Sequence, residues 1–407
     1  MSPSPIRYDV AVLGAGFGGL ATALGLAEAG CRVVLLETLG YAGGCAATFE
    51  RRGDRFEAGA TLFSGFAEGQ LMRRWIERHR LEVRHHILDP VVELRLPSFR
   101  LAVPPDRRRW VERLGALPGA PVHGLQAFFE LQGRVADVLW PLFDEPGLLP
   151  PLGPGALAAH LRRIPSYLPL LRWVGKPLVA VLEHFGVAGF EPLRSYVDAT
   201  CQITVQAPAA EAEALFALAA LDYHFRGTGH VEGGIGALAS ELVGAIRGHG
   251  GEVRFFERAE RLEAVPGGWR VWTRRGSLEA RRVVANLLPR AVLSLLDGAV
   301  PAGSRARRRL EARSQRVATG WGAAMLYLVL PPGGLEHTAA YHLELVQDAS
   351  KPLIEGNHLF CSVSAAAELG RTPQDGRTVT VSTHVPMDRL RELDGPGRAA
   401  YVGRVQE

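Results

Sequence analysis

The most constraining feature of the sequence is a glycine-rich turn near its start. Gly14-Ala15-Gly16-Phe17-Gly18-Gly19 follows a short apolar run, Tyr8 to Leu13, and precedes an Ala- and Leu-rich segment at residues 20–29. A second apolar run, Arg32 to Glu37, comes directly afterwards. Short apolar runs on either side of such a segment are typical of buried strands around a helix. The sequence therefore opens with a predicted strand–helix–strand unit and a parallel sheet.

This turn matches the GxGxxG pattern of dinucleotide-binding proteins. Gly14 permits the tight turn, Gly16 lets the backbone approach a pyrophosphate, and Gly19 allows close packing between helix and strand. The helix N-terminus offers a positive dipole end to the phosphates, and Ala15, Phe17 and Gly18 complete the turn around them. Glu37 ends the second strand, where a carboxylate accepts hydrogen bonds from ribose hydroxyls. The turn predicts a dinucleotide and does not distinguish FAD from NAD.

A second glycine-rich segment narrows the choice of cofactor. Gly43-Gly44 and Thr48 form GGxxxT, and Gly53, Phe56, Glu57 and Gly59 then form GxxFExG. Together with the first turn, this segment resembles the FAD-binding start of the phytoene desaturase and carotenoid isomerase family, within the amine-oxidase-like flavoproteins. The resemblance implies that FAD is the cofactor and that Gly43, Gly44 and Thr48 lie close to it. The alternative is an ordinary glycine-rich loop.

A later block resembles the segment with which the same family returns to its FAD domain. It contains Gly233-Gly234-Ile235-Gly236, a predicted helix at about residues 237–247, a strand at 252–256, and Val283-Val284-Ala285-Asn286. The resemblance implies that the backbone of Ala259 contacts the adenine. The sequence departs from the family pattern at Cys45, where many desaturases carry Arg. It also ends without the family's closing Gly- and Pro-rich segment, so we expect a C-terminally truncated chain that holds FAD weakly.

These observations predict an α/β protein with two domains. A discontinuous, Rossmann-like FAD-binding domain is expected at residues 1–98 and 226–298. An inserted α+β substrate domain is expected at 99–225 and 299–407. Between Leu101 and Phe225 the sequence shows helical stretches broken by proline, which indicates that this part of the substrate domain is mostly helical.

Composition excludes several functions. With 46 basic and 42 acidic residues the net charge is only +4, and no aromatic-and-basic recognition motif accompanies it, so a nucleic-acid partner is not expected. The four cysteines form no CxxC pair, which argues against a zinc knuckle or a disulfide scaffold and fits a reducing cytoplasm. His85-His86 has no partners at metal-ligand spacing, so no metal site is predicted.

No catalytic triad is visible, and the catalytic residues stay unassigned. Flavin-dependent oxidation of a hydrocarbon leaves most of the chemistry to the cofactor and to apolar positioning. Cys45 is interpreted as a small space-filling residue because no His or Lys adjoins it. Glu57 has two readings that the sequence leaves open, an acidic group close to the flavin or a structural carboxylate that caps backbone amides.

The segment from Leu148 to Phe185 mixes many leucines with Tyr167, Trp173 and basic side chains. This composition is typical of a segment in a membrane interface. A buried helical subdomain with basic side chains reaching solvent is the equal alternative. The first reading places the protein on the inner face of the membrane as a peripheral protein.

The resemblance implies an FAD-dependent oxidoreductase that desaturates or isomerises a lipophilic polyene such as a carotenoid. One alternative is a soluble amine-oxidase-like enzyme with aromatic residues near the flavin. Another is a non-catalytic lipid-binding relative, similar to the Rab GDP-dissociation inhibitors, although the intact turn from Gly14 to Glu37 argues against it.

Overall fold

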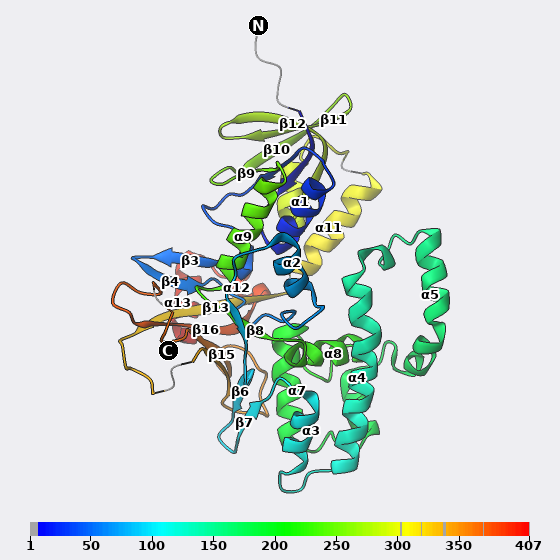
Figure 1. The fold of residues 1–407 in the computed structure, drawn as a ribbon, viewed down its shortest axis with the longest axis vertical. Coiled ribbons are helices and arrows are strands. Elements are labelled where there is room, and N and C mark those ends of the chain that lie inside the picture. The colour runs from blue at the N-terminus through cyan, green and yellow to red at the C-terminus, as the bar shows by residue number, and fades with distance from the viewer. Residues whose placement is uncertain (1–6, 302, 319, 337–338, 369, 407) are drawn as a thin grey trace.

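The structure is a computed structural model that describes residues 7–301, 303–318, 320–336, 339–368 and 370–406. Its first sheet has six strands in the order β10-β11-β12-β1-β2-β9 (Figure 1). In this sheet β1 pairs in parallel with both β2 and β12, and β2 pairs in parallel with β9. The strands are β1 (Arg7–Leu13), β2 (Val33–Leu36), β9 (Glu252–Arg254), β10 (Ala259–Val265), β11 (Gly268–Thr273) and β12 (Gly276–Ala285). The expected parallel sheet is therefore confirmed.

Two helices cover one face of the first sheet. They are α1 (Phe17–Glu28) and α9 (Ile235–Gly248), which pack on each other. In α1 the buried residues include Leu20, Ala23, Leu24 and Ala27, at the spacing of one helix face. The other face is covered by α10 (Pro289–Leu295), against which α11 (Arg305–Ala318) packs. The glycine-rich turn thus lies at the carboxyl end of β1, where α/β sheets bind their ligands.

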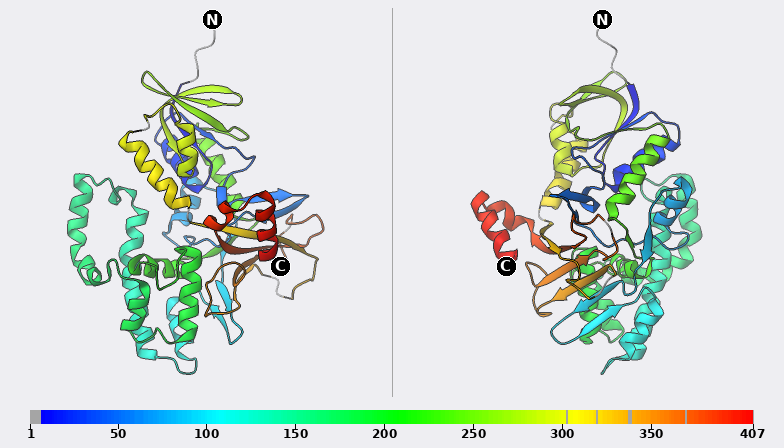
Figure 2. Two further views of the ribbon diagram at one scale, coloured as in Figure 1. Left: turned by 180° about the vertical axis from the view of Figure 1, so that it is seen from behind. Right: turned by 60° about the vertical axis from the view of Figure 1, so that its left-hand side comes forward.

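A second six-stranded sheet has the order β13-β16-β15-β14-β6-β7. Its strands are β6 (Val92–Arg95), β7 (Arg100–Val103), β13 (Trp321–Leu330), β14 (Tyr341–Val346), β15 (His358–Val363) and β16 (Arg377–Pro386). The last helices, α12 (Met387–Glu392) and α13 (Gly395–Gln406), lie on the side of this sheet away from the helical lobe (Figure 2). Because β6 belongs to this sheet, the second sheet combines residues from before and after the helical segment. The exact domain limits stay a prediction.

The segment expected to be helical does form helices. They are α3 (Arg107–Gly115), α4 (Val122–Asp144), α5 (Pro154–Tyr167), α6 (Leu178–His184), α7 (Glu191–Thr204) and α8 (Ala214–Leu221), with short 3₁₀ turns η2 (Pro146–Leu148), η3 (Leu168–Trp173) and η4 (Asp222–Phe225). Trp110, Phe128 and Tyr196 are among the large side chains buried in this lobe. Among the described residues, no helix is long and apolar enough to cross a membrane.

One hairpin, one further pair of strands and one helix connect the larger layers. The strands β3 (Thr48–Arg51) and β4 (Asp54–Glu57) pair antiparallel, as do β5 (His85–Ile87) and β8 (Gly229–Val231). The 3₁₀ turn η1 (Gly44–Ala46) precedes β3, and α2 (Leu71–His79) follows the β4 hairpin. Since β4 also contacts β16, this hairpin lies between the two large sheets.

Candidate functional site

The fingerprint turn is packed as the sequence predicts. A Cβ atom at Gly19 would lie 1.9 Å from the carbonyl oxygen of Gly14, so only glycine permits this approach of helix to turn. The side chain of Asn286, at the end of β12, lies against the same turn, 2.8 Å from where a Cβ at Gly18 would be. Phe17 begins α1, with its ring centroid 6.2 Å from that of Phe63.

Glu37 organises this turn and also borders an open pocket. Its carboxylate accepts hydrogen bonds from the backbone amides of Ala15 (2.7 Å) and Leu39 (2.9 Å). Gly14, Glu37 and Ala259 all line a pocket of about 510 Å³ at the carboxyl ends of β1 and β2. Carboxylate oxygens have further lone pairs, so Glu37 can still accept from a ribose. The pocket fits the ADP half of a dinucleotide, and its binding role stays a prediction.

The second glycine pair lies directly against the first turn. Gly16 and Gly43 form an isolated β-bridge, and the amide of Gly43 donates to the carbonyl of Ala15 at 2.8 Å. Gly44 begins η1, which leads to the exposed Cys45. The predicted cofactor-binding residues from both segments are therefore brought together. The absence of side chains at Gly16, Gly43 and Gly44 lets a pyrophosphate approach the backbone at this junction.

Thr48, by contrast, forms hydrogen bonds within the protein. Its hydroxyl accepts from the amide of Gly236 at the start of α9 (2.9 Å) and donates to Glu57 (3.0 Å). A Cβ at Gly234 would lie 2.3 Å from oxygens of both Glu57 and Thr48, so glycine is required here, where the backbone φ is also +93°. The contacts of Thr48 join β3 to α9, and cofactor contact by this residue stays a prediction.

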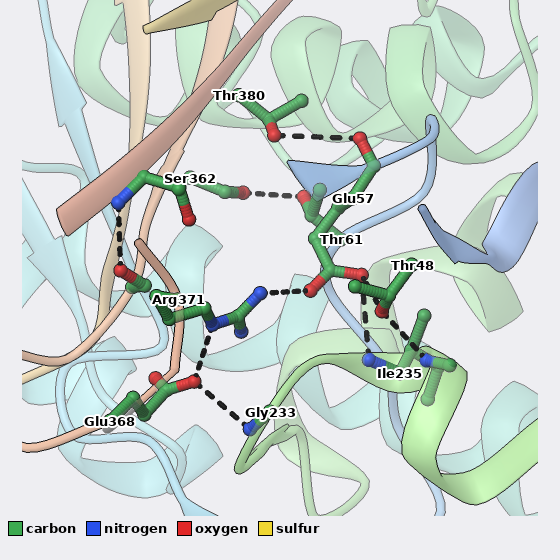
Figure 3. Close-up of polar contacts among 12 residues, drawn as sticks. Thr48, Glu57, Thr61, Gly233, Ile235, Ser362, Glu368, Arg371 and Thr380 are labelled. Atoms are coloured by element: carbon green, nitrogen blue, oxygen red, sulfur yellow. Dashed lines mark hydrogen bonds and ion pairs between the residues drawn. The ribbon is translucent and has the colours of Figure 1, made fainter. Parts of the chain in front are cut away.

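Glu57 belongs to a buried ion-pair cluster centred on Arg371 (Figure 3). The Arg371 guanidinium donates to Glu57 (3.1 Å) and to Glu368 (2.7 Å), and Glu368 contacts His230 at 2.5 Å. Although burial alone would raise it, the hydrogen bond from His230 and the charge of Arg371 lower the pKa of Glu368 to about 2. Both carboxylates also accept from amides near the start of α9, those of Gly233 and Ile235.

Of the two readings of Glu57, these contacts support the structural one. Its carboxylate caps α9 and neutralises Arg371, whose side chain is only 2% exposed. The residues that the sequence analysis missed are Glu368 and Arg371, because nothing nearby in the sequence marks them. Together they join β4 and α9 to the segment between β15 and β16.

A large cavity opens beside the second glycine pair. It measures about 710 Å³, and its lining includes Cys45, Gly59 and Thr61 from the cofactor side. Its remaining walls come from α4, α7, α8 and the second sheet, and its aromatic lining consists of Trp140, Phe143, Phe216, Tyr223, Trp321 and Phe360. Among the described residues no Asp, Glu, Lys or Arg lines this cavity. It is suited to an apolar ligand that reaches the cofactor loop.

A series of hydrogen-bonded side chains leads from this cavity into the interior of the protein. Ser362 donates to Thr61, and the Nδ1 atom of His342 lies 2.7 Å from the Ser362 hydroxyl. Burial lowers the pKa of His342 to about 3, so its ring is neutral near pH 7. Thr61, Ser362 and His342 also border a chamber of about 20 Å³ next to Arg371, enough for roughly one water molecule.

Glu344 is a second buried group on the same strand as His342. Successive side chains of β14 point to opposite faces of the sheet, so His342 and Glu344, two residues apart, both point to the buried face. Burial raises the pKa of Glu344 to about 8, and no described residue hydrogen-bonds its carboxyl group. Glu344 is therefore mostly protonated and uncharged near pH 7.

Comparison with known proteins shows which families and relatives this chain is similar to. A family model for an NAD(P)-binding Rossmann-like domain matches residues 12–78. The chain is 27% identical over 271 residues to human all-trans-retinol 13,14-reductase and 26% identical over 259 residues to prolycopene isomerase 1, chloroplastic, of an Oncidium hybrid. Each alignment covers 61% of this chain and 41% or 42% of the relative. The chain thus spans about two fifths of the length of these curated relatives.

Solved structures share the whole architecture. A crystal structure of an oxidoreductase from Methanosarcina mazei has a TM-score of 0.66 at 17% identity, over 98% of this chain and 84% of that one. A putrescine oxidase has a TM-score of 0.57 at 17% identity, over 98% of this chain and 81% of that one. A Rab GDI from Plasmodium falciparum has a TM-score of 0.55 at 10% identity, over 96% of this chain and 86% of that one. These likenesses show the fold alone.

The family model and the glycine-rich turns define a Rossmann-like dinucleotide-binding domain, and the two-sheet fold is similar to that of the oxidoreductase from Methanosarcina mazei and of the putrescine oxidase. In sequence, the chain is a relative of the retinol reductases and prolycopene isomerases. This relationship agrees with the predicted resemblance to the carotenoid isomerase family, and it supports FAD as the dinucleotide.

We predict that Gly16→Val weakens FAD binding at least tenfold, because the new side chain occupies the space that a pyrophosphate needs. Gly25→Val is the matched control, since it lies in the same helix with open space beyond it. Fluorescence titration with FAD measures the affinity of each variant. Equal FAD affinities for a folded Gly16→Val variant and the control would refute the assigned role.

We also predict that Arg371→Met lowers the free energy of unfolding by about 3–5 kcal/mol, because two carboxylates are left buried without their partner. The control, Arg389→Met, removes an exposed ion pair with Glu355 and should cost at most about 1 kcal/mol. Urea denaturation followed by circular dichroism gives both values. Similar losses in the two variants would show that the cluster around Arg371 does not hold the sheets together.

Proposed function

We propose that this chain binds FAD and catalyses oxidation, reduction or isomerisation of a lipophilic polyene. The observation that carries this proposal is the uncharged, aromatic-lined cavity that opens beside the second glycine pair. A polyene exchanges water for apolar surface when it enters such a cavity. The retinol reductase and prolycopene isomerase relatives act, by their names, on molecules of this kind.

The chain's own residues have three tasks in this reaction. Bound FAD would supply the hydride exchange, held by the turn at Gly14–Gly19 and the loop at Gly43–Gly44. The aromatic walls orient the polyene and exclude water. The hydroxyl of Thr61, backed by Ser362 and His342, is one polar group of the cavity wall through which a proton can be passed.

An amine substrate is supported less well. A cationic amine would lose its water in this cavity without meeting a carboxylate among the described lining residues, and that desolvation is costly. His384, which also lines the cavity, has its pKa lowered by burial and gives no negative charge. The cavity therefore favours a neutral, extended apolar molecule.

A direct test incubates the protein without oxygen with prolycopene or with all-trans-retinol, once loaded with oxidised FAD and once with its FAD reduced beforehand by dithionite. Isomerisation changes the polyene spectrum without net change in flavin oxidation, saturation consumes one reduced flavin per double bond, and desaturation reduces oxidised flavin. We expect one of these outcomes, detected by chromatography and flavin absorbance. A protein that keeps its FAD but alters neither polyene, while it oxidises an amine such as putrescine, would overturn the proposal.

We predict that Ala220→Trp abolishes polyene conversion while FAD content stays unchanged, because the indole fills the cavity at a residue of its wall. Ala306→Trp, on the exposed α11, is the matched control and should keep full activity. Full activity in a folded, FAD-loaded Ala220→Trp variant would show that the substrate binds elsewhere.

We further propose that the α5 region docks on a membrane. The helix α5 contains no buried residue, and it stands apart from the body of the helical lobe (Figure 1). Its exposed leucines continue into η3, with Leu157 51%, Leu161 66%, Leu168 59% and Leu171 58% exposed. A helix with so much unburied apolar surface beside basic side chains suits an anionic bilayer interface.

Part of the segment from Leu148 to Phe185 is buried, however. Trp173 is only 3% exposed, and Arg172 and Lys176 stack over its ring. Tyr167 contacts His160 at 2.9 Å. Trp173 thus packs inside the lobe, Tyr167 is hydrogen-bonded within α5, and the leucines provide the docking surface. This surface follows directly after α4, whose Trp140 and Phe143 line the cavity, so it suits a substrate that arrives from lipid.

Changing Leu157, Leu161, Leu168 and Leu171 to Asn should lower co-sedimentation with phosphatidylcholine–phosphatidylglycerol vesicles at least fivefold, since apolar insertion is lost. FAD content should not change. The control replaces the exposed Leu328 and Val329 of β13 by Asn. If the folded four-leucine variant sediments as well as the control, α5 is not the docking surface.

A further inference from the structure

The helices that cover the cofactor sheet bring three ligand-bearing side chains to one place. Glu28 is the last residue of α1, His79 is the last residue of α2, and His249 is the C-cap of α9. One ligand atom from each lies within 4.8 Å of the other two. None of these residues contributes to the dinucleotide pocket or to the aromatic cavity.

The two histidine rings are available as ligands. Their centroids are 5.6 Å apart in an edge-on arrangement, and neither ring nitrogen is hydrogen-bonded within the described part of the chain. A neutral imidazole offers a free lone pair, which is the form that binds metal ions.

The electrostatic setting also favours a cation. Because all three side chains are at helix C-termini, the negative ends of three helix dipoles meet here. The opposing charge is Arg78, which contacts the Oε1 atom of Glu28 at 2.6 and 2.7 Å. The Oε2 atom of Glu28 is left for another partner. Three dipole ends and the second oxygen of Glu28 therefore face the two histidine rings.

We propose that Glu28, His79 and His249 form a binding site for a divalent transition-metal ion, with Zn²⁺ as the expected occupant. Two imidazoles and one carboxylate suit Zn²⁺, whereas Mg²⁺ and Ca²⁺ prefer oxygen ligands only. Water would complete the coordination. The ion would link the ends of three helices that are far apart in the sequence, and it would stabilise the native state because the unfolded chain has no such site.

The test uses the full-length, tag-free protein and isothermal titration with Zn²⁺. We expect one ion per chain and a melting temperature that rises with added Zn²⁺. His79→Asn/His249→Asn should weaken binding at least tenfold and remove the thermal shift. His123→Asn, at an exposed histidine on α4, is the matched control and should behave as the wild type. FAD binding should not change in any of these variants.

A second variant tests the electrostatic argument. Arg78→Gln removes the competing charge, so it should tighten Zn²⁺ binding several-fold. With Co²⁺ in place of Zn²⁺, the visible absorption of the wild type should show nitrogen and oxygen ligands and should vanish in the double histidine variant. Failure of the wild type to bind Zn²⁺, or unchanged stoichiometry and affinity in the double variant, would overturn the proposal. Neither result depends on the proposed polyene chemistry.

Discussion

Arg371 carries its charge in the interior of the protein, and one of its two carboxylate partners comes from its own segment while the other comes from a distant part of the sequence. Glu57 belongs to the hairpin beside the cofactor turn, and Glu368 to the segment between β15 and β16. Removing these charges from water is costly and is offset only when all partners are in place. The cluster therefore holds β4, the start of α9 and the second sheet in one arrangement. Thr61 follows β4 directly, so this arrangement also places the cavity next to the cofactor loop.

The charged side chains behind the cofactor loop are paired with one another in the cluster around Arg371, and the cavity beside the loop is lined by uncharged side chains among the described residues. On the adjoining strand β14, burial keeps His342 neutral and Glu344 protonated, so these two groups add no charge beside the cluster. On the proposed function, an apolar substrate would meet no Asp, Glu, Lys or Arg among the described residues that line the cavity, while the Thr61 hydroxyl connects the cavity to Ser362 and His342.

The first sheet was partly predictable. The strand at Arg7–Leu13 and the helix after the glycine-rich turn have local signals in apolar runs and glycines, whereas the return of β9 and β12 to β2 and β1 was expected only from the family resemblance. The second sheet was not, since it pairs β6 with β14 across more than half of the chain, and no local pattern encodes such a pairing. For the same reason the partners of Glu57 were missed. The cluster of Glu28, His79 and His249 has no recognisable spacing either, because three separate helix ends bring it together.

The segment proposed to dock on a membrane shows a further limit of prediction from sequence. Residues 148–185 include apolar, aromatic and basic side chains, but the sequence alone could not say which of them are buried. The structure divides them, with Trp173 inside the lobe and the leucines of α5 outside. Amphipathic character in a short segment does not reveal which neighbours cover it.

The central claim is that the second glycine loop lies where bound FAD meets the apolar cavity, and Cys45 reports on this junction. Cys45 is exposed and lines the cavity, whereas Cys31 is partly exposed at the end of α1, away from it. The rate of alkylation at each thiol can be followed by mass spectrometry for the protein alone, with FAD, and with FAD and a polyene. The account predicts that FAD slows alkylation of Cys45 and the polyene slows it further, with Cys31 unaffected. An alkylation rate of Cys45 that neither ligand changes, measured where both are bound, would contradict it.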